Sequence, residues 1–344
     1  GMALARLLGF GALGCLYGGR IVNLLAYTLL CALALAKAER YRPAFVAIML
    51  LPMSLFMGAS LSYDATLLGC YYLMLALLTR KEWNTQTAGI YTAACIFVNI
   101  AKPYLNLLWV LPIFLVAKRE WHAKGRRPLW ALGGFGGAMA VTLLTEWYGT
   151  AFRYNYPIIE RQGGSTVNGG EQLAFVLRNP LRTIAAFWGT LGENDFFIGQ
   201  LGLFGWKDLP ISFLNLTGPL VLLLAALLAA AQPKRADAFP TRRRVGGAAL
   251  LALVYAAGAM AAMYITYTPV GMVRIVGLQA RYFLCVWLAL LPALAVLLRK
   301  TICPAITEEK AEAAITPLCA CYAVLGAVLL FQHYFVGPVY VVYA

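Results

Sequence analysis

Charged residues are scarce in this chain. Only 12% of its 344 residues are Asp, Glu, Lys or Arg, whereas 62% are hydrophobic. A soluble domain does not need so much apolar surface, and the apolar residues come in runs close to the length of a bilayer span. The short alternating segments of a transmembrane barrel are missing. The composition therefore predicts a polytopic α-helical membrane protein.

Several motifs of well-known enzyme and transporter classes are also missing. The chain has no Walker A sequence, GxSxG elbow, HExxH pair or nucleotide-binding glycine pattern. None of its eight cysteines belongs to a CxxC pair, and all but Cys303 lie in apolar runs, as small buried residues do. His122 and His333 have no metal-binding or triad partner nearby in the sequence. ATP-driven transport and soluble-type hydrolase chemistry therefore find no support.

Basic residues outnumber acidic ones by 28 to 14, which gives a net charge of +14. Most of them lie in five short loops between apolar runs, at 37–42, 80–83, 118–127, 233–244 and 299–310. No basic stripe interleaved with aromatic residues occurs, so we expect no nucleic acid partner. The positive-inside rule places the five loops in the cytoplasm. This predicts a multi-pass membrane protein with both termini extracytoplasmic.

The apolar runs predict ten transmembrane helices in one integral membrane domain, 1–344, of the all-α class. The expected spans are about 20–36, 43–60, 64–79, 87–101, 104–117, 129–148, 211–231, 246–268, 282–299 and 316–336. A turn separates the fourth and fifth because Pro103 lacks an amide donor and disfavours helix before it. Residues 3–17 are short, interrupted by glycine and carry Arg6, which predicts an interfacial helix on the outer face. An eleventh crossing is the alternative.

One connection is much longer than the others. Residues 149–210 are first polar and then amphipathic, and the charge pattern places them in an extracytoplasmic loop with amphipathic helices. A connection of this length usually has a function or covers a site. Aromatic residues such as Phe187, Trp188 and Trp206 suit a surface that lies on lipid headgroups, so we expect contact with membrane lipids.

Asp64 is the first charge of interest, because it stands at the predicted outer start of a span in "GASLSYDATLLG", residues 58–69. A carboxylate there caps free amides and complements the positive end of the helix. The functional alternative is a general base, or an anchor for a substrate hydroxyl, assisted by the neighbouring Tyr63. Both interpretations stay open.

Three cations map to the same predicted outer rim. Lys102 follows an outward-running helix, where a cation suits the negative helix end; a phosphate contact is the alternative. Arg281 stands at the start of an inward-running helix, where the helix dipole disfavours a cation, so an anionic partner is expected. The guanidinium suits phosphate through its bidentate geometry. Arg274, in the same loop, is expected to assist.

A metal site has only weak support. Glu193 and Asp195, in "GENDFF", could share a divalent cation with phosphate oxygens, whereas a turn or helix cap is the ordinary interpretation. No cofactor is otherwise indicated.

Four blocks in one order carry a family resemblance: "GRIVNLLAYTLLCALAL" (19–35), "LLPMSLFMGASLSYDA" (50–65), "NIAKPYLNLLWVLP" (99–112) and "IVGLQARYFLCVWLALLP" (275–292). Over nearly the whole chain they resemble a family of predicted bacterial membrane proteins of unassigned function, which is similar to the GT-C glycosyltransferases. GT-C enzymes move a sugar from a polyprenyl-phosphate carrier to an acceptor on the outer face. The resemblance implies a catalytic carboxylate in a first external loop, commonly an acidic pair after a first span. This sequence begins at "GMALARLLGF" and contains neither, so a truncated or inactive form is also expected.

The resulting hypothesis is a GT-C-like glycosyltransferase of cell-envelope assembly, using a polyprenyl-phosphate-linked sugar and a glycan, lipid or protein acceptor. Arg281 and Lys102 hold the phosphate, Arg274 assists, and Asp64 positions the acceptor or serves as base. The alternatives are a transporter or flippase of a lipid-linked intermediate and a non-catalytic partner subunit. A flippase would need ionisable residues near mid-membrane, and the predicted spans have almost none.

Overall fold

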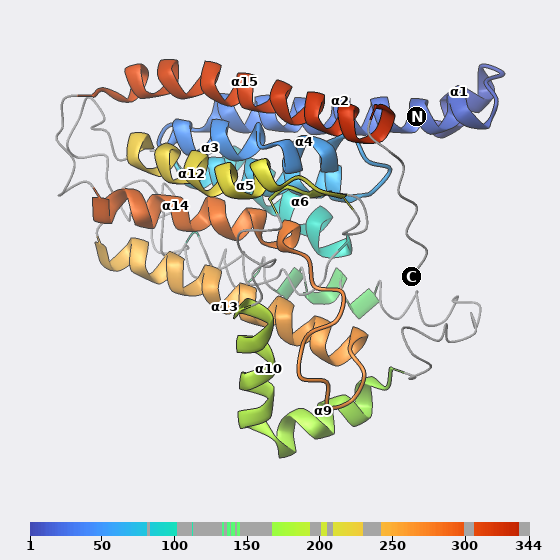
Figure 1. Ribbon diagram of the computed structural model, residues 1–344. Helices are drawn as coiled ribbons and strands as arrows, with labels where there is room; N and C mark the ends of the chain where they lie inside the picture. Colours follow the sequence, from blue (N-terminus) through green and yellow to red (C-terminus); the bar gives the residue numbers. More distant parts are fainter. Residues whose placement is uncertain are drawn as a thin grey trace.

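The computed structural model describes residues 1–80, 83–101, 112, 133, 136–137, 139–141, 143–144, 167–192, 201–204, 209–229, 242–298 and 306–336. This part of the chain is mostly helical, and its long helices lie side by side in one bundle (Figure 1). The helices are α1 (Met2–Leu7), α2 (Ala12–Lys37), α3 (Arg42–Met49), α4 (Pro52–Gly58), α5 (Asp64–Leu78), α6 (Thr85–Ala101), α9 (Gly169–Arg178), α10 (Pro180–Gly192), α12 (Ser212–Ala229), α13 (Arg242–Tyr267), the 3-10 helix η4 (Ala280–Phe283), α14 (Leu284–Leu298) and α15 (Glu308–Phe335).

Four of the described helices are long and apolar enough to cross a membrane: α2, α12, α13 over Val245–Tyr267, and α15 over Glu309–Phe335. The apolar α5 is shorter. Helices also occupy the predicted spans at 87–101 and 282–299, as α6 and α14. The predicted spans at 104–117 and 129–148 fall wholly or mostly outside the described residues. Ten crossings therefore remain a prediction, whereas the described residues form a helical bundle with four helices long and apolar enough to cross a membrane.

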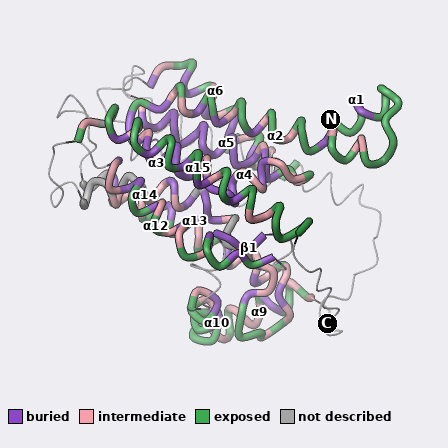
Figure 2. The backbone as a smooth tube through the Cα atoms, turned by 45° about the horizontal axis from the view of Figure 1, so that its top comes forward, coloured by how far each residue is buried: buried purple, intermediate pink, exposed green. Residues whose placement is uncertain are grey.

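The centre of the bundle is α5. It is apolar on every side, and all of its residues except Thr66 are buried, as expected for a helix surrounded by others. Figure 2 shows this buried centre against the exposed outer helices. Glycines bring α2 close: a Cβ on Gly69 would lie 2.7 Å from the Cβ of Leu30, and one on Gly58 would lie 2.8 Å from the ring of Tyr27. Small residues at these positions therefore set the distance between α2 and its neighbours.

The segment predicted as one span at 43–60 is not one continuous helix, because it forms two short helices, α3 and α4. The break falls at Pro52, which has no amide to donate and whose ring crowds the preceding turn. Leu51, the residue before it, takes an extended conformation with φ −56° and ψ 136°. The apolar run continues on both sides of Pro52, so hydrophobicity alone does not mark the break.

The carbonyl groups released at this break are satisfied inside the bundle. Ser54 Oγ donates to the carbonyl of Ile48 at 2.6 Å, and the hydroxyl of Tyr27 donates to that of Met49 at 2.8 Å. The hydroxyl of Tyr72 lies 3.2 Å from Ser54 Oγ. Helix breaks at membrane depth need such internal partners, because no water is there to replace the lost hydrogen bonds.

The N-terminal segment predicted as one helix at 3–17 is divided between α1 and the start of α2. A turn at Gly9, whose φ is +81°, ends α1, since glycine adopts this left-handed conformation without strain. The chain then reverses, and α1 packs against α2, with Met2 beside Gly19. Its position at a membrane surface stays a prediction.

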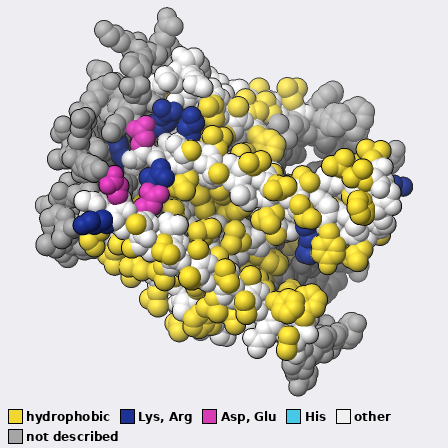
Figure 3. Space-filling view, turned by 90° about the horizontal axis from the view of Figure 1, so that it is seen from above, with side chains coloured by type: hydrophobic (Ala, Val, Ile, Leu, Met, Phe, Trp, Pro, Cys, Tyr) yellow, Lys and Arg dark blue, Asp and Glu magenta, His cyan; other side chains and the backbone are white. Residues whose placement is uncertain are grey.

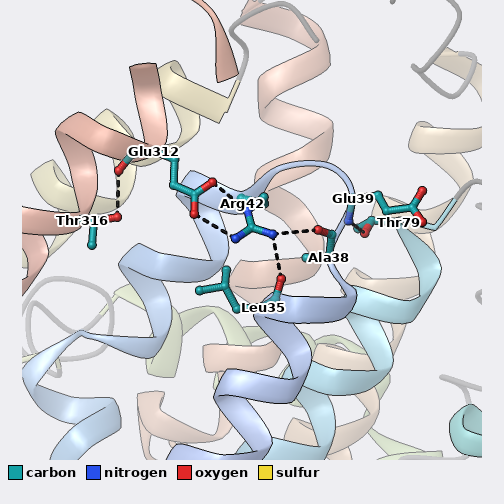
Figure 4. A network of polar contacts seen from close by, with 7 residues as sticks. All are labelled: Leu35, Ala38, Glu39, Arg42, Thr79, Glu312 and Thr316. Carbon is teal, nitrogen blue, oxygen red and sulfur yellow. Dashed lines mark hydrogen bonds and ion pairs between the residues drawn. The ribbon is translucent and has the colours of Figure 1, made fainter. Parts of the chain in front are cut away.

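Helix ends that carry a cluster of charges meet at one end of the bundle, which we call the charged end: residues 37–42, 79–80 and 309–312. Figure 3 shows basic and acidic side chains gathered there, while hydrophobic side chains cover most of the remaining face. Arg42 donates to both carboxylate oxygens of Glu312, at 2.7 and 3.0 Å, and also to the carbonyls of Leu35 and Ala38 (Figure 4). One guanidinium thus ties α3 to α15 and to the end of α2.

A second set of contacts joins α2 to α5 at the charged end. The amide of Glu39 donates to Thr79 Oγ1 at 3.0 Å (Figure 4), and Arg80 Nε lies 3.6 Å from the carboxylate of Glu39. Helices α2 and α5 end here, and α3 and α15 begin here. The described residues of these three basic loops therefore lie on one side, as the charge pattern requires; that this side is cytoplasmic remains a prediction.

The described part includes one small β-hairpin, which an all-α prediction does not contain. Strands β1 (Leu203–Phe204) and β2 (Leu209–Pro210) pair antiparallel just before α12. The amide of Gly202 donates to Asn215 Oδ1 at 2.6 Å, and the amide of Ile211 donates to the Gly202 carbonyl at 2.8 Å. Phe204 packs edge-on against Phe56 of α4, with ring centroids 5.1 Å apart. The hairpin thus fastens the end of the long loop to the bundle.

Candidate functional site

Asp64 is the only buried carboxylate in the part of the chain that the structure describes, with 9% of its surface exposed. It is the first residue of α5, and Tyr63, which stands before it, makes no side-chain cap. Its own amide donates to Ser62 Oγ at 3.1 Å. Asp64 therefore lies in the first helical turn, where a negative charge is favourable, and does not occupy the usual capping position. A charge removed from water at a helix start is a candidate site residue.

The turn before Asp64 is held in a fixed shape by α2. Asn23 Nδ2 donates to the carbonyls of Ser60 and Ser62, at 2.7 and 3.1 Å. Tyr63, predicted to contact substrate, is exposed over 59% of its surface. The turn thus presents an exposed phenol next to a buried carboxylate. Sequence reasoning missed Asn23, because an amide in an apolar run gives no hint of which distant backbone it binds.

The second half of the candidate site is built on α9 and α10, which we call the elbow. Asn168 caps α9 by accepting from the amides of Gly170 and Glu171, at 3.1 and 3.2 Å. The two helices meet at Asn179, just before Pro180 opens α10. The elbow projects from the bundle below α13 in Figure 1, and α9 packs against α13.

The elbow holds the loop that precedes α14, residues 268–278, which we call the arginine loop after Arg274. Gln172 Oε1 accepts from the amide of Gly271 at 2.9 Å, and Thr190 Oγ1 accepts from the amide of Ile275 at 2.9 Å. Gln172 and Thr190 are buried, so these bonds are protected from water. Two backbone positions of the arginine loop are therefore set by side chains that lie far away in the sequence.

The bundle side fixes the same loop. The hydroxyl of Tyr264 donates to the carbonyl of Met272 at 2.7 Å, and Thr268 Oγ1 accepts from the amide of Val276 at 3.1 Å. Gly271 and Gly277 both have φ of +75°, which a residue with a side chain adopts only with strain. No pattern in the sequence points directly to these neutral positioning residues. The one available hint was the pair of polar residues, Gln172 and Thr190, on otherwise apolar helix faces.

The predicted site residues are placed as follows. Arg274 is exposed in the arginine loop, and Arg281 lies in η4, which leads directly into α14. Helices α5 and α14 pack against each other, and both run from the end opposite the charged end toward it (Figure 1). Asp64 and η4 therefore lie at the same end of two neighbouring helices. Lys102, Glu193 and Asp195 lie outside the described residues.

No group of three or more metal-ligating side chains comes together among the residues that the structure describes. The predicted acidic pair, Glu193 and Asp195, is not among them, so a divalent cation there stays a prediction.

A family model for predicted membrane proteins, DUF2142, matches residues 1–290 of the chain. The chain belongs to this family. No curated protein and no solved structure matches it. The match includes Asp64, the elbow and the arginine loop, whereas α15 lies beyond it. The family description names a membrane protein and no reaction, so any chemistry has to be argued from the candidate site.

Proposed function

We propose that this DUF2142 protein is a membrane glycosyltransferase that takes a sugar from a polyprenyl-phosphate carrier and passes it to a glycan, lipid or protein acceptor. The observation that carries the proposal is the buried carboxylate of Asp64, at the same end of the bundle as η4 and its Arg281. A carboxylate and arginines are the complementary groups that this transfer requires. The resemblance to GT-C glycosyltransferases suggests the donor.

The roles follow from the charge changes in the reaction. Asp64 accepts the proton of the acceptor hydroxyl as its oxygen attacks the anomeric carbon of the sugar. The bond from that carbon to the phosphate oxygen breaks, and the polyprenyl phosphate leaves with the electron pair. Arg281, with Arg274 and Lys102, holds the phosphate and stabilises the charge that it gains. The outer face of a bacterial inner membrane is the proposed location.

The proposal predicts separate effects on binding and turnover in the purified protein in nanodiscs, given radiolabelled polyprenyl-phosphate hexoses and crude envelope acceptors. Asp64→Asn should keep donor binding and reduce transfer by roughly a hundredfold or more, the usual contribution of a general base. Arg281→Gln should weaken donor binding about tenfold, the value of one charge-assisted contact. Glu309→Gln is the matched control, because Glu309 is exposed at the charged end.

Two outcomes would overturn the proposal. Donor binding that survives Arg281→Gln unchanged would remove Arg281 from the site, and transfer that survives Asp64→Asn unchanged would remove Asp64. Donor binding without transfer by the unmodified protein would favour a non-catalytic partner subunit.

A flippase of a lipid-linked intermediate is the second candidate, because the break between α3 and α4 resembles the discontinuous helices of transporters. The carbonyls at this break already accept from Tyr27 and Ser54, which leaves them poorly suited to bind a cargo. Transbilayer movement of a fluorescent polyprenyl-phosphate sugar in proteoliposomes, reduced by Ser54→Ala but unaffected by Asp64→Asn, would favour the flippase.

A further inference from the structure

The elbow has an exposed apolar face that no other described element covers. Leu177, Leu181, Ile184 and Trp188 are exposed over 74, 79, 63 and 75% of their surfaces. Residues 181, 184 and 188 are three and four positions apart on α10, so they lie on one face of that helix. Figure 2 shows the corresponding exposure along α10. The opposite face, with Ala186 and Thr190, is buried.

The apolar surface is not confined to the helices. Val273, at the tip of the arginine loop, is exposed over 75% of its surface, and Val270 and Met272 are exposed as well. The arginine loop hydrogen-bonds to the elbow through Gln172 and Thr190. A Cβ on Gly189 would lie 3.5 Å from the carbonyl oxygen of Val273, so the exposed part of the loop adjoins α10 next to Trp188. Elbow and loop therefore present neighbouring apolar surface from two segments distant in the sequence.

Basic residues accompany this surface. Arg178 and Arg182 are exposed at the bend of the elbow, and Arg274 is exposed next to Val273. Glu171 is the only carboxylate in residues 167–192 and 268–278. Leucine, isoleucine and tryptophan on one face with arginines beside them are the features of helices that lie in the headgroup region of an anionic bilayer. The chain already stands in a bilayer, so the elbow is held near such a surface.

We infer that the elbow docks on the headgroup region of the bilayer, with anionic lipid as its partner, and thereby holds the arginine loop at the depth of lipid phosphates. The two buried bonds, from Gly271 to Gln172 and from Ile275 to Thr190, transmit the position of the elbow to the loop. Docking is independent of the reaction. The role given to the loop rests on the proposed function, since a polyprenyl carrier presents its phosphate at the same depth.

The docking is tested by quenching of tryptophan fluorescence in nanodiscs made with brominated lipids. The emission of Trp188 is obtained as the difference between the unmodified protein and Trp188→Phe. Bromine near the headgroup should quench this emission more strongly than bromine near the end of the acyl chain, because interfacial helices lie only about 5–10 Å deep. Stronger quenching by the deep label, or none by either, would overturn the inference.

The lipid charge and the coupling to the loop need separate readouts. Trp188 should be quenched more strongly in phosphatidylglycerol than in phosphatidylcholine. The double variant Arg178→Gln, Arg182→Gln should reduce this difference; an unchanged difference would contradict the choice of anionic lipid.

Hydrogen exchange at the amides of Gly271 and Ile275 should slow by roughly tenfold when detergent is replaced by anionic bilayer, equivalent to about one hydrogen bond. Equal exchange in both would show that the elbow does not transmit its position.

A second copy of the chain is the competing occupant. In that case the quenching of Trp188 and the slowing of hydrogen exchange would depend on the number of protein copies per nanodisc rather than on the lipid, which would overturn the inference.

The test also separates the two proposals. Quenching with no donor binding would leave the docking intact and refute the glycosyltransferase, whereas donor binding without quenching would do the reverse.

Discussion

The two ends of the bundle are built with different chemistry. At the charged end, Arg42 and Glu312 bind each other, and Arg42 also satisfies carbonyls of α2. At the opposite end, the elbow and the arginine loop are joined by neutral side chains that bind backbone amides, while Arg178, Arg182 and Arg274 are exposed. At the charged end, charged side chains therefore join helices to one another. At the opposite end, the three arginines are accessible at the surface, whereas the guanidinium of Arg42 is partly buried against Glu312.

The largest expected effect on stability is at the charged end. Arg42→Ala removes two bonds to Glu312 and two to backbone carbonyls, and should lower the free energy of unfolding by about 2–3 kcal/mol, given that both side chains are partly buried. Thermal unfolding of the purified protein in detergent measures it. Arg178→Ala is the matched control and should change stability by less than about 0.5 kcal/mol.

A double-mutant cycle then isolates the pair. Adding Glu312→Ala to Arg42→Ala should cost little more than Arg42→Ala alone, because the carboxylate has already lost its partner. Fully additive losses would mean that Arg42 acts through the carbonyls of α2 and not through Glu312.

A smaller, local effect is expected at the elbow. Thr190→Val keeps the shape of the side chain but leaves the buried amide of Ile275 without its acceptor, at a cost of about 1–2 kcal/mol. Hydrogen exchange should show faster opening of the arginine loop, with the bundle unchanged. The control Thr316→Val removes a hydroxyl that donates to the carbonyl of Glu312 in its own helix, and should leave the loop unaffected. Equal exchange in both variants would argue against a positioning role for Thr190.

The smallest effect is expected for the second charged contact. Arg80 Nε and the carboxylate of Glu39 are 3.6 Å apart and about a quarter to a third exposed, so Glu39→Gln should cost only about 0.2–0.5 kcal/mol. Raising the ionic strength should remove this difference, because salt screens exposed pairs. A loss as large as that for Arg42→Ala would show that the charged end works as one network.

Much of the fold could be predicted from apolar runs and loop charge. The helices α5, α12, α13, α14 and α15 overlap the runs that predict them, because an apolar stretch of that length has few alternatives to a helix in a bilayer. The break at Pro52 could have been predicted from the proline alone. The bounds of α1 and α2 could not, since they depend on how Met2 and Gly19 pack after the turn at Gly9.

The candidate site was only partly predictable. Asp64, Arg274 and Arg281 are visible as rare charges near the ends of apolar runs. Asn23, Gln172 and Thr190 are not, because each acts on a backbone segment distant in sequence, and neutral polar side chains are common on helices.

The sequence by itself determined that this is a helical membrane protein, which helix ends carry charge, and which few charges stand apart from the basic loops. These properties follow from local composition, since hydrophobicity and charge act residue by residue. Only the tertiary structure decided that Asp64 is buried, that α5 lies at the centre, and that the elbow holds the arginine loop. Burial and hydrogen-bond pairing depend on which distant segments meet, and that is settled by packing of the whole chain.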